Sequence, residues 1–434
     1  MQATTDKIAE LLAGTYDDPD GLGKQGVLTK SVAIERSLAG MELDLVKALD
    51  LGRRIAVVSD TATHSVLGER VERALRGTFE IESIILPGSP HPDDTTAAQL
   101  RKQTAGADAL VAIGSGTIND LCKFASANDG KPYAVFATAP SMNGYTSVNA
   151  AITEHGHKKS LPAQAPRGAF FDLTILAAAP ARLIRSGLGD SLCRSTSQAD
   201  WLLAHLLLDH PYRELPYALL EGDERDLFDN SAALVAGDIA IMERLVRVLV
   251  LSGFGTAIHG NSQPASQGEH LISHYIDMLG DPARPLYYHG EQIGVTTLSM
   301  ARLQERMLET APVVKPDSAT LESFIARYGE ELGRSCWSEF AQKRLDQAGA
   351  DNLNHELAKS WDAIRARISS ISHSVAYLER VLNAAGAPIA PAQIHLPRPF
   401  YETALRHCRE IRNRYTFLDL AADAGTLPAL AAQI

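Results

Sequence analysis

Short apolar runs alternate with helix-like segments through the first 170 residues of the chain. Residues 55–58, Ile-Ala-Val-Val, are flanked by polar residues, and such a run is typical of a strand buried on both faces. Between the runs, apolar residues recur at helical spacing, as at Leu67, Val71 and Leu75. The alternation predicts a doubly wound, Rossmann-like parallel sheet. The other predicted strands are residues 81–86, 109–113 and 133–137, and a further helix is predicted over 94–103.

The pattern changes after about Asp172, where strand-like runs nearly disappear. Segments rich in Ala, Leu, Arg and Glu follow, joined by Gly/Pro-containing connections at 280–285 and 384–391. We therefore predict an α/β domain over residues 1–172 and an all-α domain over 173–434. The predicted helices of the second half include residues 232–251, 321–332, 352–371 and 400–414.

Charge and composition exclude several classes of protein. The 41 basic and 52 acidic residues give a net charge of −11, without a Lys/Arg-dense run, so nothing favours nucleic-acid binding. Residues 1–14 carry charges throughout, unlike a signal peptide. The most apolar stretch, 245–254, is interrupted by Arg247, so we expect no membrane insertion. Four widely spaced cysteines without a C-x-x-C pair suit a reducing cytoplasm, the location that we expect.

A glycine-containing loop follows the third predicted strand at residues 112–120, Ala-Ile-Gly-Ser-Gly-Thr-Ile-Asn-Asp. Gly114 and Gly116 would let the backbone approach a pyrophosphate, and the helix N-terminus behind them supplies free N–H groups. An ordinary tight strand-to-helix turn explains the same residues. Asp60 ends the first predicted strand and precedes this loop, whereas the acid of the usual fingerprint follows it by about 20 residues. Asp60 is therefore a candidate either for a ribose hydroxyl or for a helix N-cap.

A second polar loop, residues 138–147 (Thr-Ala-Pro-Ser-Met-Asn-Gly-Tyr-Thr-Ser), follows the strand at 133–137. Open α/β sheets bind ligands beyond the carboxyl ends of their strands. The loop is either part of such a site or a polar connection with common turn chemistry.

Acidic and imidazole side chains in the second half form a possible metal site. Asp190 lies in Ser-Gly-Leu-Gly-Asp at a predicted helix start, His270 and His274 are four apart and so share a helix face, and His289 precedes Gly-Glu. One carboxylate and two imidazoles suit a divalent cation with an open coordination position. The chain contains 14 histidines, so ordinary core or surface roles remain an alternative for these residues.

The order of these motifs resembles that of the sn-glycerol-1-phosphate dehydrogenases. The matching elements are Gly-Ser-Gly-Thr-Ile-Asn-Asp followed by Lys123, then the loop at 138–147, then Gly-Asp, His-x3-His and His-Gly-Glu. This family lies within the superfamily of iron-containing alcohol dehydrogenases, glycerol dehydrogenase and 3-dehydroquinate synthase. The resemblance covers about residues 53–295 and implies a dehydroquinate synthase-like fold, with dinucleotide bound by the α/β domain and metal and substrate by the helical domain.

The resemblance also implies a role for each matching residue. Asp60 would contact the adenosine ribose, and its carboxylate would favour NAD over NADP, with NADP still possible. The metal ligands would be Asp190, His270 and His289, holding zinc, nickel or iron. The remaining cofactor-binding residues would be Gly114, Ser115, Gly116, Thr117 and Ile118 at the pyrophosphate and Thr138, Ser141 and Ser147 near the nicotinamide.

The implied reaction is hydride transfer between the nicotinamide and the carbonyl carbon of dihydroxyacetone phosphate, whose carbonyl oxygen a divalent cation polarises. Asp190 and His274 would be the catalytic residues and would border the substrate, and His274 would exchange a proton with the oxygen. Asn143 replaces the aspartate usual at a substrate-binding position. Lys158 and Lys159, on the loop before the last strand of the first domain, are candidates for the substrate phosphate, or else belong to a solvated charged turn.

Alternative functions remain open at this point. A phosphate-eliminating lyase of the dehydroquinate synthase type also uses NAD and a divalent metal, and a glycerol or polyol dehydrogenase would share the same motifs. A nucleotide-binding protein without a working metal site is a non-enzymatic alternative. The resemblance further implies a homodimer or larger homo-oligomer whose partner is a small phosphorylated polyol or ketone.

Overall fold

A computed structural model describes residues 6–434, and the chain divides into two compact units. The first contains the described residues up to Glu154, Lys159–Ser191 and Arg213–Ser262; the second contains His155–Lys158, Leu192–Tyr212 and Gln263–Ile434. The change from strands to helices falls at Asp172, where the last strand ends, but the compact units do not divide there. Helices from 173–191 and 213–262 complete the first unit, so each unit is discontinuous in sequence.

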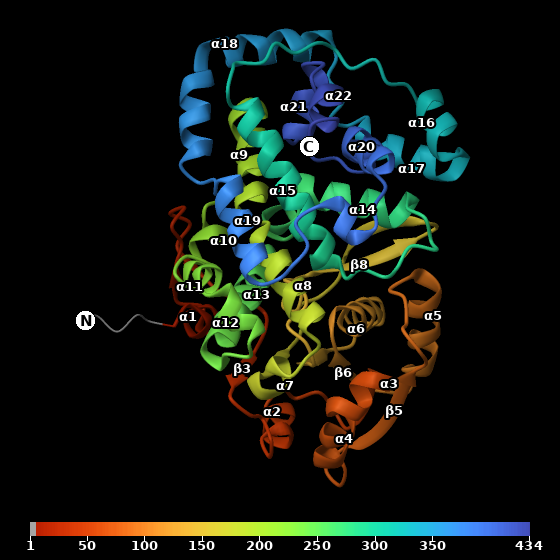
Figure 1. Ribbon diagram of the computed structural model, residues 1–434. Coiled ribbons are helices and arrows are strands. Elements are labelled where there is room, and N and C mark those ends of the chain that lie inside the picture. Colours follow the sequence, from red (N-terminus) through yellow and green to blue (C-terminus); the bar gives the residue numbers. More distant parts are fainter. Residues whose placement is uncertain (1–5) are drawn as a thin grey trace, which may run out of the picture. The chain divides into compact units, whose positions relative to one another are not determined.

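A six-stranded parallel sheet forms the centre of the first unit, in the order β3-β10-β7-β6-β4-β5 (Figure 1). This confirms the predicted doubly wound parallel sheet. The strand-like runs of the sequence correspond to β4, β5, β6 and β7, and the edge strand β3 was not predicted. The strands are β3 (Ser31–Glu35), β4 (Arg54–Asp60), β5 (Glu80–Leu86), β6 (Ala109–Gly114), β7 (Tyr133–Ala137) and β10 (Gly168–Asp172).

Helices cover both faces of this sheet, which is why its central strands are apolar along their whole length. Ile55, Val57 and Phe136 share one buried cluster with Val46 of α2 and Val71 of α4. On the other face, α6 packs against β4, β6 and β7. The helices of this unit are α1 (Lys7–Ala13), α2 (Glu42–Lys47), α3 (Thr61–Thr63), α4 (Glu69–Leu75), α5 (Asp94–Gln103), α6 (Gly116–Asn128), α7 (Leu173–Ala177), α8 (Ala181–Leu192, whose last residue falls in the second unit), α10 (Leu215–Ala218), α11 (Asp223–Asp229), α12 (Ser231–Val235) and α13 (Ile239–His259), with the π-helical turn η1 (His64–Gly68).

Two short hairpins accompany the sheet: β1 (Tyr16–Asp17) with β2 (Lys24–Gln25), and β8 (Asn149–Glu154) with β9 (His157–Pro162). The turn between β8 and β9 has positive φ angles at His155 (50°) and Gly156 (79°), the combination that a two-residue type I′ turn requires. Lys158 and Lys159 therefore lie in a strand, and their predicted placement on a loop is wrong.

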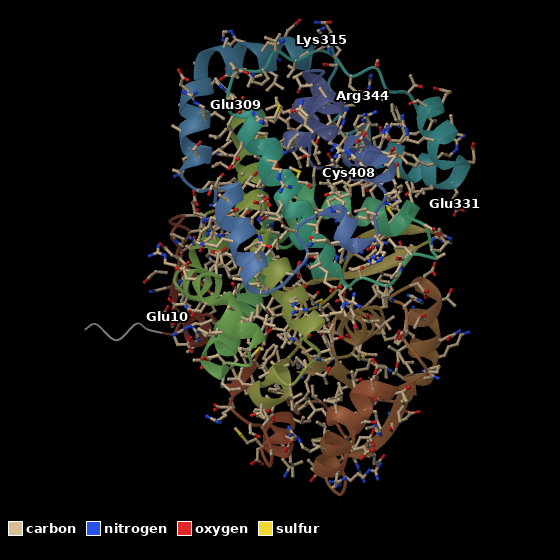
Figure 2. The ribbon with its side chains drawn as sticks, in the orientation of Figure 1. Glu10, Glu309, Lys315, Glu331, Arg344 and Cys408 are labelled. Carbon is tan, nitrogen blue, oxygen red and sulfur yellow. The ribbon has the colours of Figure 1, made fainter. Side chains whose placement is uncertain are left out.

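The second unit consists mainly of helices around one large apolar core. Cys408 lies among these helices, whereas Glu309, Lys315, Glu331 and Arg344 lie at the periphery of the unit (Figure 2). The helices are α9 (Arg194–Leu208), α14 (Gly268–Leu279), α15 (His289–Met307), α16 (Leu321–Tyr328), α17 (Glu330–Phe340), α18 (Gln347–Ser369), α19 (Val375–Ala384), α20 (Arg398–His407), α21 (Phe417–Asp423) and α22 (Leu427–Ala431), with the 3-10 turns η2 (Gln263–Ala265), η3 (Pro391–Ile394) and η4 (Cys408–Ile411).

Glycine breaks two of the helices that were predicted as continuous. The segment 232–251 divides at Gly237 (φ 88°), after which Asp238 caps α13. The segment 321–332 divides between α16 and α17 at Gly329 (φ 82°). Glycine adopts a positive φ angle without strain, and this angle interrupts the regular hydrogen bonding of a helix. Each break therefore follows from the local sequence.

The four cysteines are buried free thiols. Within residues 6–434, no helix has both the length and the apolar character needed to cross a membrane. Residues 1–5 of the N-terminal stretch used for the signal-peptide prediction lie outside the described residues.

Candidate active site

Three adjacent strands of the first unit end beside one another at the carboxyl edge of the sheet. Strand β4 ends at Asp60, β6 ends at Gly114, and β7 is followed by Thr138. The chain moves outward from β4 to β5 and then returns to place β6 on the other side of β4. Such a reversal marks the crevice in which open α/β sheets bind ligands. The structure thus brings the two predicted cofactor loops and Asp60 to the same edge of the first unit.

Asp60 is the N-cap of α3. Its Oδ1 accepts a hydrogen bond of 2.8 Å from the backbone N–H of Thr63, and the Thr63 hydroxyl oxygen accepts one of 3.0 Å from the Asp60 N–H in return. The N-cap interpretation of Asp60 is therefore confirmed. Capping does not occupy the whole carboxylate, so a second role toward a ribose hydroxyl stays a prediction.

The loop at 114–118 forms the start of α6, as predicted. Ser115 is the N-cap, with extended backbone angles and no capping bond from its side chain. The backbone N–H groups of Gly116, Thr117 and Ile118 form the first turn of this helix, where N–H groups have no partner within the helix. These donors suit a phosphate oxygen.

Lys123 holds the loop that follows β7. This side chain is fully buried, and its Nζ donates to the carbonyl oxygens of Gly144 (2.5 Å) and Asn149 (3.1 Å) and to Ser147 Oγ (2.9 Å). Burial lowers the pKa of Lys123 to about 8, although nearby Asp120 partly opposes the shift. Ser147 Oγ is engaged by Lys123 and lies 3.0 Å from both carbonyl oxygens, so this hydroxyl serves the loop itself. The sequence motif contained Lys123, but its role as the centre of the loop was not predicted.

The same loop contacts helix α8 closely. A Cβ on Gly187 would lie 1.7 Å from the carbonyl oxygen of Pro140, so only glycine permits this approach. The contact brings two predicted residues together, because Asp190 Oδ2 accepts a hydrogen bond of 2.7 Å from the Asn143 N–H. Asp190 lies near the end of α8, so its predicted place at a helix start is wrong. Ser141, also buried, accepts a hydrogen bond from Ser186 at its carbonyl oxygen.

Three imidazoles cluster in the second unit. His270 and His274 lie one turn apart on α14, as their spacing predicted, and His289 begins α15. The ring centroid of His289 lies 5.1 Å from that of His270 and 5.9 Å from that of His274. Nitrogen atoms of His270 and His289 approach within 4.8 Å of each other, a separation that one bound cation can span. Asp190 belongs to the first unit, so its joining these two ligands stays a prediction.

Glu269 fixes the orientation of the His270 ring. His270 Nδ1 lies 2.8 Å from Glu269 Oε1, and because a carboxylate accepts, Nδ1 carries the hydrogen and Nε2 presents its lone pair. Glu269 is fully buried and also accepts from the Gln267 N–H and the Thr196 hydroxyl. A histidine that ligates a metal almost always donates its other ring N–H in this way. The donor set therefore fits a divalent cation at His270. Cys193 lies close enough to Glu269 and His270 to form an alternative ligand group, but the Glu269 hydrogen bond occupies His270 Nδ1.

The start of α14 is held in place by Asp200. Its carboxylate accepts hydrogen bonds from the N–H groups of Gly268 and Phe417, both 3.0 Å long. A Cβ on Gly268 would lie 2.5 Å from Met300 Cε and 2.7 Å from Asp200 Oδ2, so the close approach requires glycine. Burial, followed by the charge of Glu269, raises the pKa of Asp200 to about 8.

His274 lies in positive surroundings. Arg412 Nη2 lies 2.9 Å from His274 Nδ1, and because a guanidinium only donates, the ring hydrogen of the neutral imidazole is on Nε2. Burial and then Arg412, with smaller effects of His289, Lys158 and His270, lower the pKa of His274 well below its ordinary value. His274 is therefore a neutral donor through Nε2. Neither Glu269 nor Arg412 was predicted from the sequence, and only the acidic residue directly before His270 gave a local signal.

The two candidate phosphate-binding lysines are engaged in different places. Lys158 Nζ lies 3.2 Å from Asp277 Oδ2 in the second unit. Lys159 Nζ lies 3.5 Å from Glu154 Oε2 in the first unit, where its side chain is 37% exposed. Their predicted role at a phosphate stays a prediction, and each already has a carboxylate partner.

Comparison with known proteins defines the class first. The profile of the iron-containing alcohol dehydrogenase family matches residues 33–180. A probable glycerol dehydrogenase from Sinorhizobium meliloti 1021 has the same fold, with a TM-score of 0.59 and 17% identity over 93% of this chain and 97% of that one. The protein is thus an NAD(P)-linked oxidoreductase with the fold of the iron-containing alcohol dehydrogenases.

Full-length relatives then give the family. The NAD(P)+-dependent glycerol-1-phosphate dehydrogenase of Thermococcus kodakarensis is 30% identical over 288 residues, which are 65% of this chain and 81% of that relative. The enzyme of the same name from Halalkalibacterium halodurans is 28% identical over 84% of this chain and 85% of its own length. The chain belongs to the glycerol-1-phosphate dehydrogenase family, which confirms the resemblance drawn from its motifs.

Proposed function

We propose that the protein reduces dihydroxyacetone phosphate to sn-glycerol 1-phosphate with NADH, reversibly and with the help of a divalent metal. The observation that carries this proposal is the pair His270 and His289 in a chain of this family, with His270 oriented by a buried carboxylate. Such a pair has the donor chemistry of a catalytic metal site that leaves room for a substrate oxygen.

We assign the metal to Asp190, His270 and His289, with zinc, nickel or iron as the ion. A bound cation of this kind supplies Lewis-acid polarisation of the substrate carbonyl. The Asn143 N–H orients the Asp190 carboxylate. Neutral His274 would donate a hydrogen bond from Nε2 to the developing alkoxide and pass to it a proton taken from solvent. Asn143 and Asp190 also border the substrate. The helix α6 N-terminus with Thr138 and Ser141 positions the cofactor, and Ser147 contributes through the loop that its hydroxyl holds in place.

Asp60 supports NAD over NADP as the preferred cofactor. Its carboxylate lies at the end of β4, at the carboxyl edge of the sheet where the ribose of a dinucleotide lies in related α/β folds. A negative charge there accepts a hydrogen bond from a ribose hydroxyl and repels a 2′-phosphate. We further propose a cytoplasmic enzyme, in line with its four free thiols, and a homodimer or larger homo-oligomer, which light scattering of the purified protein tests directly.

The test is a substrate panel with NADH and NADPH, each with added zinc, nickel or iron. We expect dihydroxyacetone phosphate to drive stoichiometric NADH oxidation. The product should resist an oxidase specific for sn-glycerol 3-phosphate, which identifies the opposite enantiomer. A dehydroquinate synthase-like lyase regenerates its cofactor in each turnover, so product without net NADH loss would exclude the proposed reaction. Turnover of glycerol in place of its phosphate would assign the polyol dehydrogenase alternative.

A further inference from the structure

Arg412 is a buried guanidinium without a carboxylate partner. Only 8% of the residue is exposed, and its hydrogen bonds go to His274 Nδ1 (2.9 Å) and the carbonyl oxygen of Lys158 (3.4 Å). Among residues 6–434 it forms no ion pair, although arginines buried to this degree are usually paired. Burial, followed by the repulsion of Arg414, lowers the pKa of Arg412 to about 9, so the side chain still carries its charge at neutral pH.

The same unit neutralises a neighbouring buried arginine completely. Arg409, three residues earlier and 9% exposed, forms ion pairs with Asp317 and Asp419. These carboxylates more than offset its burial, and the pKa of Arg409 is raised. Carboxylates of this unit therefore pair with one buried arginine, Arg409, whereas Arg412 has no such partner within the described part of the chain.

Besides burial, the groups that lower the pKa of His274 are Arg412, His289, Lys158 and His270, all of which are cationic or neutral. Lys158 contributes a second positive charge but shares it with Asp277, 3.2 Å away. Glu339 is the acidic residue that raises the pKa of Arg412, and burial together with Arg414 outweighs it. A concentration of positive charge in a buried position is stable when an anion completes it. The planar fork of a guanidinium matches two oxygens of a phosphoryl group.

We propose that Arg412 binds the phosphoryl group of the substrate and thereby makes the enzyme select phosphorylated over unphosphorylated ketones. This inference rests on the proposed function for the identity of the substrate. It places the selectivity in the C-terminal segment that follows η4, outside the matched motifs. The diphosphate of the cofactor is the other possible source of phosphoryl oxygens, and the experiment separates the two.

The kinetic arm compares dihydroxyacetone phosphate with dihydroxyacetone for the wild type and Arg412→Met. Loss of a buried charged partner is expected to lower kcat/KM for the phosphorylated ketone about 100-fold or more. The value for dihydroxyacetone should fall far less, because that ketone loses only the hydrogen bond that orients His274, and the Kd of NADH should stay unchanged. Arg412→Lys keeps the charge without the fork, so an intermediate loss is expected. Arg344→Met, at an exposed arginine that donates to the Asp317 carbonyl, is the matched control and should alter neither substrate.

The binding arm uses inorganic phosphate and calorimetry and needs no turnover. We expect the wild type and Arg344→Met to bind phosphate with a Kd on the order of 1 mM, which corresponds to about −4 kcal/mol, and Arg412→Met not to bind it. If dihydroxyacetone phosphate proves not to be a substrate, the proposed function fails while this arm still tests Arg412. A wild type that does not bind phosphate overturns the inference even if the variants fail to fold.

Two further outcomes also overturn it. An equal loss for both ketones with unchanged phosphate affinity would mean that Arg412 acts only by orienting His274. A raised Kd of NADH with an unchanged preference for the phosphorylated ketone would assign the arginine to the cofactor diphosphate.

Discussion

Each compact unit contains a buried cationic side chain, and the two side chains differ in their hydrogen-bond and ion-pair partners. In the first unit, Lys123 donates to three oxygens of the loop that follows β7, so its charge is used within the unit. In the second unit, Arg412 faces an imidazole and one distant carbonyl and has no ion-pair partner among the described residues. Lys123, surrounded by acceptors, stabilises the fold of its loop, whereas the uncompensated charge of Arg412 favours the binding of an anion.

The rest of each unit follows the same division. The edge of the sheet offers backbone N–H groups, small hydroxyl residues and the carboxylate of Asp60, which suit a dinucleotide. The helical unit offers imidazoles and positive charge, which suit a metal ion and an anionic substrate. If this comparison is correct, substitutions in the helical unit should impair metal or substrate binding without loss of cofactor binding. Substitutions at the cofactor-binding residues of the first unit should have the reverse effect, whereas Asp190 and Asn143 of that unit belong with the metal and the substrate.

The largest effect is expected for His270→Ala. Removal of a metal ligand eliminates several kcal/mol of transition-state stabilisation, so kcat should fall about 1,000-fold or more. Metal content by mass spectrometry should fall with it, while the Kd of NADH from fluorescence titration stays the same. His355→Ala, at an exposed histidine of α18, is the control and should keep full activity. An active, metal-containing His270→Ala would remove the metal site from the second unit. Asp190→Ala, in the first unit, should behave as His270→Ala does if its carboxylate completes the ligand set.

The next effect is expected for Glu269→Gln, which retains the shape of the side chain and removes its charge. Metal affinity should fall about 10- to 100-fold, because a weaker acceptor at Nδ1 makes His270 a poorer ligand. Competition with a chelator measures this affinity. Excess metal should restore most of the activity, and that recovery distinguishes Glu269 from a residue that acts on the substrate. Unchanged chelator competition would contradict the assignment.

Features of the fold and the site that depend on local sequence patterns could be predicted from the sequence. Apolar runs identified β4, β6 and β7, because strands buried on both faces are apolar throughout, and a shorter apolar run identified the partly exposed edge strand β5. Four-residue spacing placed His270 and His274 on one face of α14. Features that depend on tertiary neighbours were missed. Arg412 meets His274 across 138 residues of sequence, and nothing near it in the chain indicates a site. Asp190 was placed at the wrong end of its helix, because Gly187 and Gly189 lie inside α8, where Gly187 permits the close approach of Pro140, 47 residues earlier.

The third largest effect is expected for Lys123→Met, which removes the buried ammonium group that holds the loop after β7. Three oxygens would lose their buried donor, so the KM of NADH should rise about tenfold as the loop loosens, with metal content unchanged. The variant also predicts a pH effect with a definite sign. The folded-state pKa of about 8 lies below 10.5, so unfolding takes up a proton between these values, and wild-type stability should rise with pH across that window. Urea titrations at pH 8 and pH 10 measure the rise, which should be smaller in the variant. A normal KM for NADH with reduced metal content would reverse the comparison between the units.

The smallest effect concerns cofactor choice and uses Asp60→Asn. Asparagine caps helices about as well as aspartate does, so the hydrogen bond to the Thr63 N–H and the start of α3 should persist, whereas the negative charge disappears. Without the repulsion of a 2′-phosphate, kcat/KM for NADPH relative to NADH should rise by about three- to tenfold, an effect of about 1 kcal/mol. Asp60→Ala is the matched variant that removes both cap and charge, so a loss of stability in that variant alone separates capping from recognition. If Asp60→Asn leaves the ratio of the two cofactors unchanged, Asp60 is a structural cap, and the preference between NAD and NADP is set elsewhere along the edge of the sheet.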